Sequence, residues 1–182
     1  MATRGVRMSV PVLVAFATRS GSTGEVANAI ADSLKEAGLA AEVLPMHAIE
    51  SLEERTAVVL GAPLYIGRFP REFHRFVCRH REALSKLRPW CFVLGPTRDL
   101  PADFEAARKQ AEKQLSRYAW FKPQGVHIFG GRWGPKTLPF PFSLVQRLPM
   151  RPLDKIPAAD IRDWSAIREW ATRIAQQIKP AG

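Results

Sequence analysis

The fold of this chain is decided by the stretch Thr18-Arg19-Ser20-Gly21-Ser22-Thr23-Gly24-Glu25. An apolar run precedes it at residues 10–17, and an amphipathic run follows it at residues 22–37. This order predicts a strand, a tight turn rich in glycine and hydroxyl groups, and then a helix. Such a turn directs unpaired backbone N–H groups and the positive end of the helix dipole toward one point. A phosphate monoester suits that point, and the Ser and Thr hydroxyls add further donors.

Two other phosphate motifs are missing from this turn. A nucleotide-triphosphate P-loop ends in Gly-Lys-Ser/Thr, and a dinucleotide fingerprint has three spaced glycines; the turn has neither. It therefore suits one terminal phosphate held mainly by neutral donors. Serine and threonine are also favoured as helix caps, so the turn by itself is equally consistent with an ordinary capped helix.

The composition is that of one globular domain spanning residues 1–182, with residues 1–9 as a flexible N-terminus. No segment resembles a signal peptide, and no apolar run is long enough to span a bilayer. Cys78 and Cys91 are too few for a disulfide framework. We therefore expect a protein of the reducing cytoplasm, either free or at the inner face of the membrane.

The net charge of +10 would draw the protein to acidic surfaces such as anionic lipid, nucleic acid or an acidic partner. The arginines are scattered rather than clustered, and no nucleic-acid-binding motif accompanies them. We therefore expect no nucleic-acid partner. Peripheral association with a membrane and an ordinary basic surface both remain open.

Apolar runs alternate with helical patterns along the chain. After the first strand and helix, we expect strands at residues 41–44, 56–62, 90–95 and 125–131, and helices at residues 70–87, 102–118 and 165–178. Strands that alternate with helices form a parallel sheet with helices on both faces. The predicted fold class is therefore α/β, with a doubly wound, five-stranded parallel sheet.

Residues 132–160 interrupt this alternation, because they are rich in proline and aromatic residues and show no strand pattern. A stretch this long between a strand and a helix often has a function. Phe140, Phe142 and Leu144 lie there among basic residues, as in a membrane or partner patch. Proline breaks the amphipathic pattern, however, which favours a cover over the sheet edge or over a cofactor.

In an open parallel sheet, ligands bind at the carboxyl ends of the strands, where the strand order reverses. The loops expected there are residues 18–23, 61–68, 95–99 and 130–133. Tyr65 can stack on a flat ring, and its small neighbours let backbone amides approach a heterocycle. Taken alone, Tyr65 is better explained by packing on Phe69. Together, these loops predict a pocket for a mononucleotide with a large planar head.

These loops resemble those of the flavodoxin-like family, which binds flavin mononucleotide (FMN), and the resemblance covers residues 10–178. Residues 18–23 resemble its phosphate loop, residues 61–67 its first ring-binding loop, and residues 95–98 lie where its second such loop falls. The resemblance implies FMN as the cofactor and the following cofactor-binding residues: Thr18, Arg19, Ser20, Gly21, Ser22, Thr23, Pro63, Leu64, Tyr65, Ile66, Gly67, Arg68, Gly95, Pro96, Thr97 and Arg98.

Within that family, the chain most resembles the branch that includes the menaquinone-dependent protoporphyrinogen dehydrogenases. Tyr65-Ile66-Gly67, residues 132–160 and Asp163-Trp164 carry this part of the resemblance. It implies an FMN-dependent oxidoreductase that works with a quinone, another small molecule or a redox partner. A flavodoxin-type electron carrier and a non-catalytic binding module are the alternatives; carriers of this family are typically acidic, and this chain is basic.

No side chain has the setting of an acid–base or nucleophilic catalyst, and no metal site is expected. His74, Cys78 and His80 share one predicted helix, but their spacing fits no zinc site; we expect Cys78 in the core and the two histidines on the surface. Arginines lie in or beside the cofactor loops, and cations there favour extra negative charge on a flavin. The chain should therefore have a higher reduction potential than an acidic flavodoxin. These arginines are Arg19, Arg68, Arg98 and Arg132.

Overall fold

The computed structural model describes residues 11–133 and 158–178. The expected flexible N-terminus, residues 1–9, and the apolar part of the long insertion, residues 138–153, lie outside the described residues. Within the described ranges, no helix is both long and apolar enough to cross a membrane.

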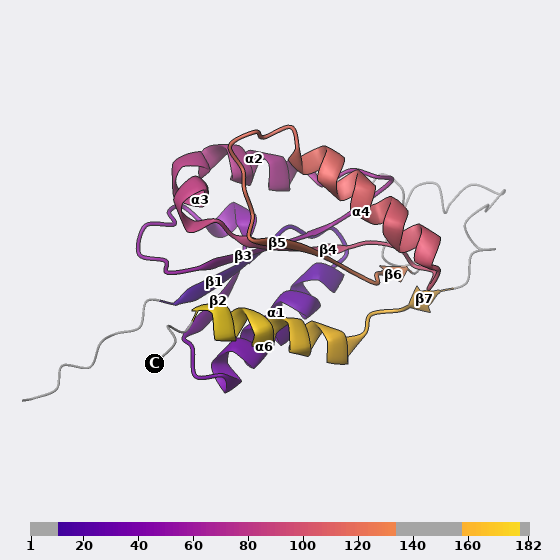
Figure 1. Cartoon of the computed structure of the whole chain (residues 1–182), viewed down its shortest axis with the longest axis horizontal. Coiled ribbons are helices and arrows are strands. Elements are labelled where there is room, and N and C mark those ends of the chain that lie inside the picture. The colour runs from indigo at the N-terminus through magenta and orange to yellow at the C-terminus, as the bar shows by residue number, and fades with distance from the viewer. Residues whose placement is uncertain (1–10, 134–157, 179–182) are drawn as a thin grey trace, which may run out of the picture.

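A five-stranded parallel sheet forms the centre of the molecule (Figure 1). Its strands lie in the order β2-β1-β3-β4-β5. The predicted α/β fold class is confirmed, and each of the five expected strands is present within a few residues of its expected bounds. The strands are β1 (Val12–Phe16), β2 (Ala41–Pro45), β3 (Val58–Pro63), β4 (Trp90–Leu94) and β5 (Gly125–Phe129).

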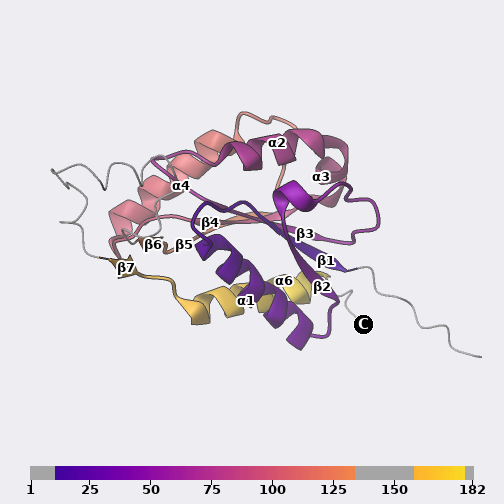
Figure 2. The ribbon, with the colours of Figure 1, turned by 180° about the vertical axis from the view of Figure 1, so that it is seen from behind.

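Helices cover both faces of this sheet (Figures 1 and 2). One face carries α1 (Ser22–Glu36) and α6 (Trp164–Ile178), and the other carries α2 (Arg71–Arg79), α3 (Arg81–Leu87) and α4 (Pro101–Leu115). A short 3₁₀ helix, η1 (Met46–Ala48), follows β2.

The core divides along β1, because successive side chains of a strand point to opposite faces. Val12 and Val14 are buried with the apolar residues of α1 and α6. Leu13 and Ala15 are buried with those of the opposite helices. This two-sided burial explains why the strand is a continuous apolar run rather than an alternating one.

The predicted helix at residues 70–87 is two helices, which meet at His80. His80 has a non-helical backbone (φ −101°, ψ 27°), and its ring packs against Phe76 with centroids 4.5 Å apart. His80 is buried and Cys78 is exposed, so the predictions for these two residues were wrong. His80 follows Phe76 by four residues and Val77 by three, so it falls on the face that these two residues bury, whereas Cys78 lies off that face.

The ends of the long insertion form a small antiparallel pair, β6 (Arg132–Trp133) and β7 (Ala159–Asp160), which the sequence did not predict. Strands this short carry no detectable periodicity. The hairpin leads into α6, whose first turn is capped by Asp163: its Oδ1 accepts a hydrogen bond from the backbone N–H of Ala166 at 3.0 Å.

Candidate functional site

The candidate site lies where the order of the strands reverses. β1 and β3 are neighbours in the sheet, but the chain continues from β1 to β2 on one side and from β3 to β4 on the other. The loops that follow β1 and β3 therefore diverge from adjacent points at the carboxyl edge, which is the usual ligand position in this architecture.

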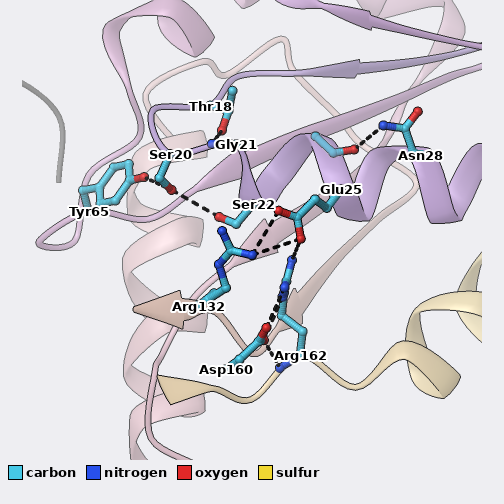
Figure 3. A network of polar contacts seen from close by, with 11 residues as sticks. Thr18, Ser20, Gly21, Ser22, Glu25, Asn28, Tyr65, Arg132, Asp160 and Arg162 are labelled. Carbon is cyan, nitrogen blue, oxygen red and sulfur yellow. Dashed lines mark hydrogen bonds and ion pairs between the residues drawn. The ribbon is translucent and has the colours of Figure 1, made fainter. Parts of the chain in front are cut away.

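The loop after β1 is drawn into a compact turn at the start of α1 (Figure 3). The backbone N–H of Gly21 donates to Oγ1 of Thr18 at 2.9 Å, and the hydroxyl oxygens of Ser20 and Ser22 are 3.3 Å apart. Gly21 has φ +85°, the left-handed region that favours glycine, and a Cβ there would meet no atom within 4 Å. Glycine is therefore favoured here by the backbone conformation and not by a lack of room for a side chain, and the space beside it is open.

Thr23 gives this loop the character of a binding site. It is fully buried in the first turn of α1, and its hydroxyl oxygen has no hydrogen-bond partner among the residues that the structure describes. A buried hydroxyl without a partner lowers stability, so a ligand that accepts from it would remove that cost. Together with the helix N-terminus and the open space at Gly21, this donor set fits a terminal phosphate.

The loop after β3 closes on itself as a tight turn. The backbone groups of Tyr65 and Arg68 form two reciprocal hydrogen bonds of 2.9 Å each. Both central residues have positive φ, +47° at Ile66 and +71° at Gly67, as in a type I′ turn. Glycine suits such a position, but a β-branched residue does not. Ile66 nevertheless stands there with 93% of its surface exposed.

The structure brings these two loops together. The hydroxyl oxygens of Ser20 and Tyr65 lie 3.3 Å apart, within hydrogen-bond distance (Figure 3). The guanidinium of Arg19 lies over the Tyr65 ring, 5.7 Å from its centroid. A predicted phosphate-binding turn and a predicted ring-stacking residue therefore share one end of the sheet.

The remaining predicted residues are more dispersed. Pro63 is buried as the last residue of β3, and the backbone N–H of Leu64 donates to the carbonyl of Leu94 at 2.8 Å. In the loop after β4, Pro96 accepts a hydrogen bond from Gly131, whereas Arg98 forms a bidentate ion pair with Asp103 at 2.8 and 3.0 Å. The second ring loop is therefore hydrogen-bonded to the end of β5 and the residues after it, and to the first turn of α4.

One feature beside the site was missed by sequence reasoning: an ion-pair network of Glu25, Arg132, Asp160 and Arg162, referred to below as the Glu25 network (Figure 3). The Arg162 side chain is only 3% exposed. Its hydrogen bond to Asp160 raises the pKa of the guanidinium and lowers that of the carboxyl. The network joins the first turn of α1 to the β6–β7 hairpin, although Glu25 and Arg162 are 137 residues apart in the sequence.

Comparison with known sequences agrees with this architecture. The chain is 27% identical over 173 residues to the quinone-linked protoporphyrinogen IX dehydrogenase of Escherichia coli K12, with 90% of this chain and 93% of that protein covered. It is also 27% identical over 171 residues to the corresponding protein of Leishmania major, covering 90% of this chain and 74% of that protein. The predicted resemblance to this branch is thereby confirmed.

Solved structures show the same fold at lower sequence identity. A flavodoxin from Pseudomonas aeruginosa, solved as a point mutant, has a TM-score of 0.57 and 16% identity, with 93% of this chain and 99% of that chain covered. An archaeal flavodoxin has a TM-score of 0.53 and 15% identity over the same shares. The sequence-family model for the flavodoxin domain matches residues 13–156, which is most of the chain. The protein therefore belongs to the flavodoxin domain family.

Proposed function

We propose that this protein binds FMN and is an FMN-dependent oxidoreductase. The observation that carries the proposal is the contact of the hydroxyl- and glycine-rich turn with Tyr65, beside the hydroxyl of Thr23, which has no partner in the part of the chain that the structure describes. One loop has the donors for a phosphate, and the adjoining loop has an aromatic ring and tight backbone for a planar head. The family membership supports the same cofactor.

In this proposal, the turn after β1 holds the phosphate through the hydroxyls of Ser20, Ser22 and Thr23 and through its backbone amides. Thr18 holds the turn in shape through its bond to Gly21. The loops after β3 and β4 hold the ring, with Tyr65 orienting it. FMN, when bound, supplies the redox chemistry, because the side chains of these loops offer no redox group.

The cofactor-binding set of this proposal is the one that the resemblance implies. It comprises Thr18, Arg19, Ser20, Gly21, Ser22, Thr23, Pro63, Leu64, Tyr65, Ile66, Gly67, Arg68, Gly95, Pro96, Thr97 and Arg98.

The reaction that we propose is the one named for the relatives from E. coli and L. major. Hydrogen removed from a porphyrinogen would reduce a quinone to the quinol, so that electrons and protons balance between the two substrates. The net charge of +10 supports a role near an anionic membrane surface, where lipid quinones reside, more than a standard electron-carrier role.

Two measurements test the proposal in sequence. The purified protein should show the visible absorption of oxidised flavin or acquire it when FMN is added. A colourless protein that takes up no FMN would contradict the proposal and favour the non-catalytic binding module. The flavin-loaded protein should then turn over protoporphyrinogen with a quinone. Flavin that cycles with one-electron acceptors but not with these substrates would favour the carrier.

The charge of the loops supplies a further check. Arg19 and Arg68 are exposed beside Tyr65, so we expect the reduced flavin to be stabilised relative to that in an acidic flavodoxin. A spectroelectrochemical titration at low and high salt would measure this. A very low potential, unchanged by salt, would contradict it.

A further inference from the structure

Arg132 occupies an unusual place beside the candidate phosphate turn. It comes from β6, 107 residues after Glu25 in the sequence, yet its Nη1 donates to both carboxylate oxygens of Glu25, at 3.1 and 3.3 Å. Glu25 is in the first turn of α1, where its backbone N–H donates to the carbonyl of Gly21. Figure 3 shows the guanidinium of Arg132 directed at this turn of the helix.

Glu25 is itself fixed by a second arginine. Nη1 of Arg162, which is buried, donates to Oε2 of Glu25 at 2.7 Å. The other side of Arg162 is held by Asp160 through bonds of 2.8 and 2.6 Å. Glu25 therefore has a hydrogen bond from a buried cation, which it shares with Asp160, in addition to its bonds from Arg132.

Arg132 retains donors that this arrangement does not use. Both of its bonds to Glu25 come from the single nitrogen Nη1, and its side chain is 32% exposed. A guanidinium has five N–H donors in a planar fork, so it can bridge two anions at once. On a helix, Ser22 and Glu25 are neighbours three residues apart, with Cβ atoms ~5–6 Å from each other. A group bonded to Glu25 is thus within reach of an anion held at Ser22.

We propose that Arg132 binds the phosphate of the cofactor, as a charged donor beside the neutral turn. This inference rests on the proposed binding of FMN. Among the residues that the structure describes, the buried hydroxyl of Thr23 has no hydrogen-bond partner, which marks the first turn of α1 as a place for an acceptor. Glu25 is the positioning residue: it holds one end of the guanidinium, while the remaining donors face the phosphate. Recognition of the phosphate then depends on the β6–β7 pair as well as on the turn after β1.

The rival explanation is that Arg132 only pins the hairpin to α1. Riboflavin separates the two explanations, because it has the same ring as FMN but no phosphate. A pinning residue would affect both ligands through the shape of the pocket. A phosphate-binding residue would affect FMN and leave riboflavin unchanged.

The experiment titrates the full chain with FMN and with riboflavin, following flavin fluorescence. Arg132→Gln should weaken FMN binding by roughly tenfold or more, since a charge-assisted hydrogen bond is lost, and leave riboflavin binding within about twofold. Arg132→Lys should restore part of the FMN affinity, because the charge remains but the fork does not. Lys35→Gln is the matched control: it removes one positive charge from the far end of α1.

The unmodified protein gives a second test that needs no variant. Raising the salt concentration should weaken its binding of FMN more than its binding of riboflavin, because salt screens an exposed ion pair. Equal losses for both ligands on Arg132→Gln, or no loss for either, would overturn the inference, as would equal salt dependence of the two ligands. If the unmodified protein binds riboflavin and FMN equally, Arg132 has no phosphate role although the flavin proposal stands; if it binds neither, both proposals fail.

Discussion

The two loops that meet at the candidate site both contain a residue with positive φ, but one loop has glycine there and the other has isoleucine. After β1, the left-handed position falls on Gly21, at φ +85°, where glycine costs little. After β3, it falls on Ile66, at φ +47°, and only the next residue is Gly67. A β-branched residue in this region costs about 1–2 kcal/mol. The first loop is relaxed, whereas the second carries strain.

The strain at Ile66 is not repaid by packing. Its side chain is 93% exposed, so it buries almost no apolar area that could offset the backbone cost. Nothing in the folding of the turn calls for isoleucine, since a type I′ turn favours asparagine, aspartate or glycine at this position. Strained residues persist mostly where function requires them. The second loop is thus the part of the site whose sequence is least explained by the fold.

The largest expected effect on stability and on FMN affinity comes from a substitution that introduces backbone strain into the first loop as well. Gly21→Val should lower the free energy of unfolding by about 2 kcal/mol, since valine resists φ +85°. It should also weaken FMN binding by roughly 100-fold, because two or more backbone donors would leave the phosphate. Urea unfolding and fluorescence titration measure the two effects.

Gly38 supplies the matched control, because it has φ +84° at the opposite end of α1. Gly38→Val should cost a similar free energy of unfolding but leave FMN affinity unchanged. If both variants lost FMN affinity equally, the loss would reflect general destabilisation, and the first loop would have no special part in binding.

The relaxed loop was predictable from sequence and the strained one was not. A buried apolar run, a glycine between hydroxyl residues and an amphipathic helix are local signals, and they placed residues 18–23 correctly at the carboxyl edge. Ile66 contradicts the local rule, because no propensity argument assigns a left-handed backbone to a β-branched residue. Sequence reasoning could name Ile66 by resemblance only.

The Glu25 network was missed for a different reason. Its ion pairs join α1 to a hairpin of two-residue strands, and such distant pairing has no periodicity for a sequence to reveal. The predictions for His80 and Cys78 failed because they followed residue type instead of helical spacing: His80 shares the buried face of Phe76 and Val77, whereas Cys78 lies off it. The sheet, its order of elements and the loop positions follow from local patterns, whereas side-chain partners between distant elements require the structure.

A smaller effect, of opposite sign, is expected from relaxing the second loop. Ile66→Gly should raise the free energy of unfolding by about 0.5–1 kcal/mol, because the relieved strain exceeds the added entropy of the unfolded chain. Ile66→Val keeps the β-branch and should leave stability unchanged, so it is the control. Urea unfolding without added FMN measures both. A loss of stability in Ile66→Gly would mean that the exposed side chain contributes packing, and the contrast between the loops would fail.

The smallest effect concerns the contact that joins the loops. Ser20→Ala and Tyr65→Phe each remove one of the hydroxyl groups that lie 3.3 Å apart. In a double-mutant cycle without FMN, the two substitutions should be coupled by only about 0.5 kcal/mol in free energy of unfolding, because the hydrogen bond is long and half-exposed. With FMN, a shared ligand should increase that coupling, since each loop would then position the cofactor for the other. Coupling that vanishes with FMN bound would show that the two loops act independently. The strain at Ile66 would then need an explanation that does not involve the first loop.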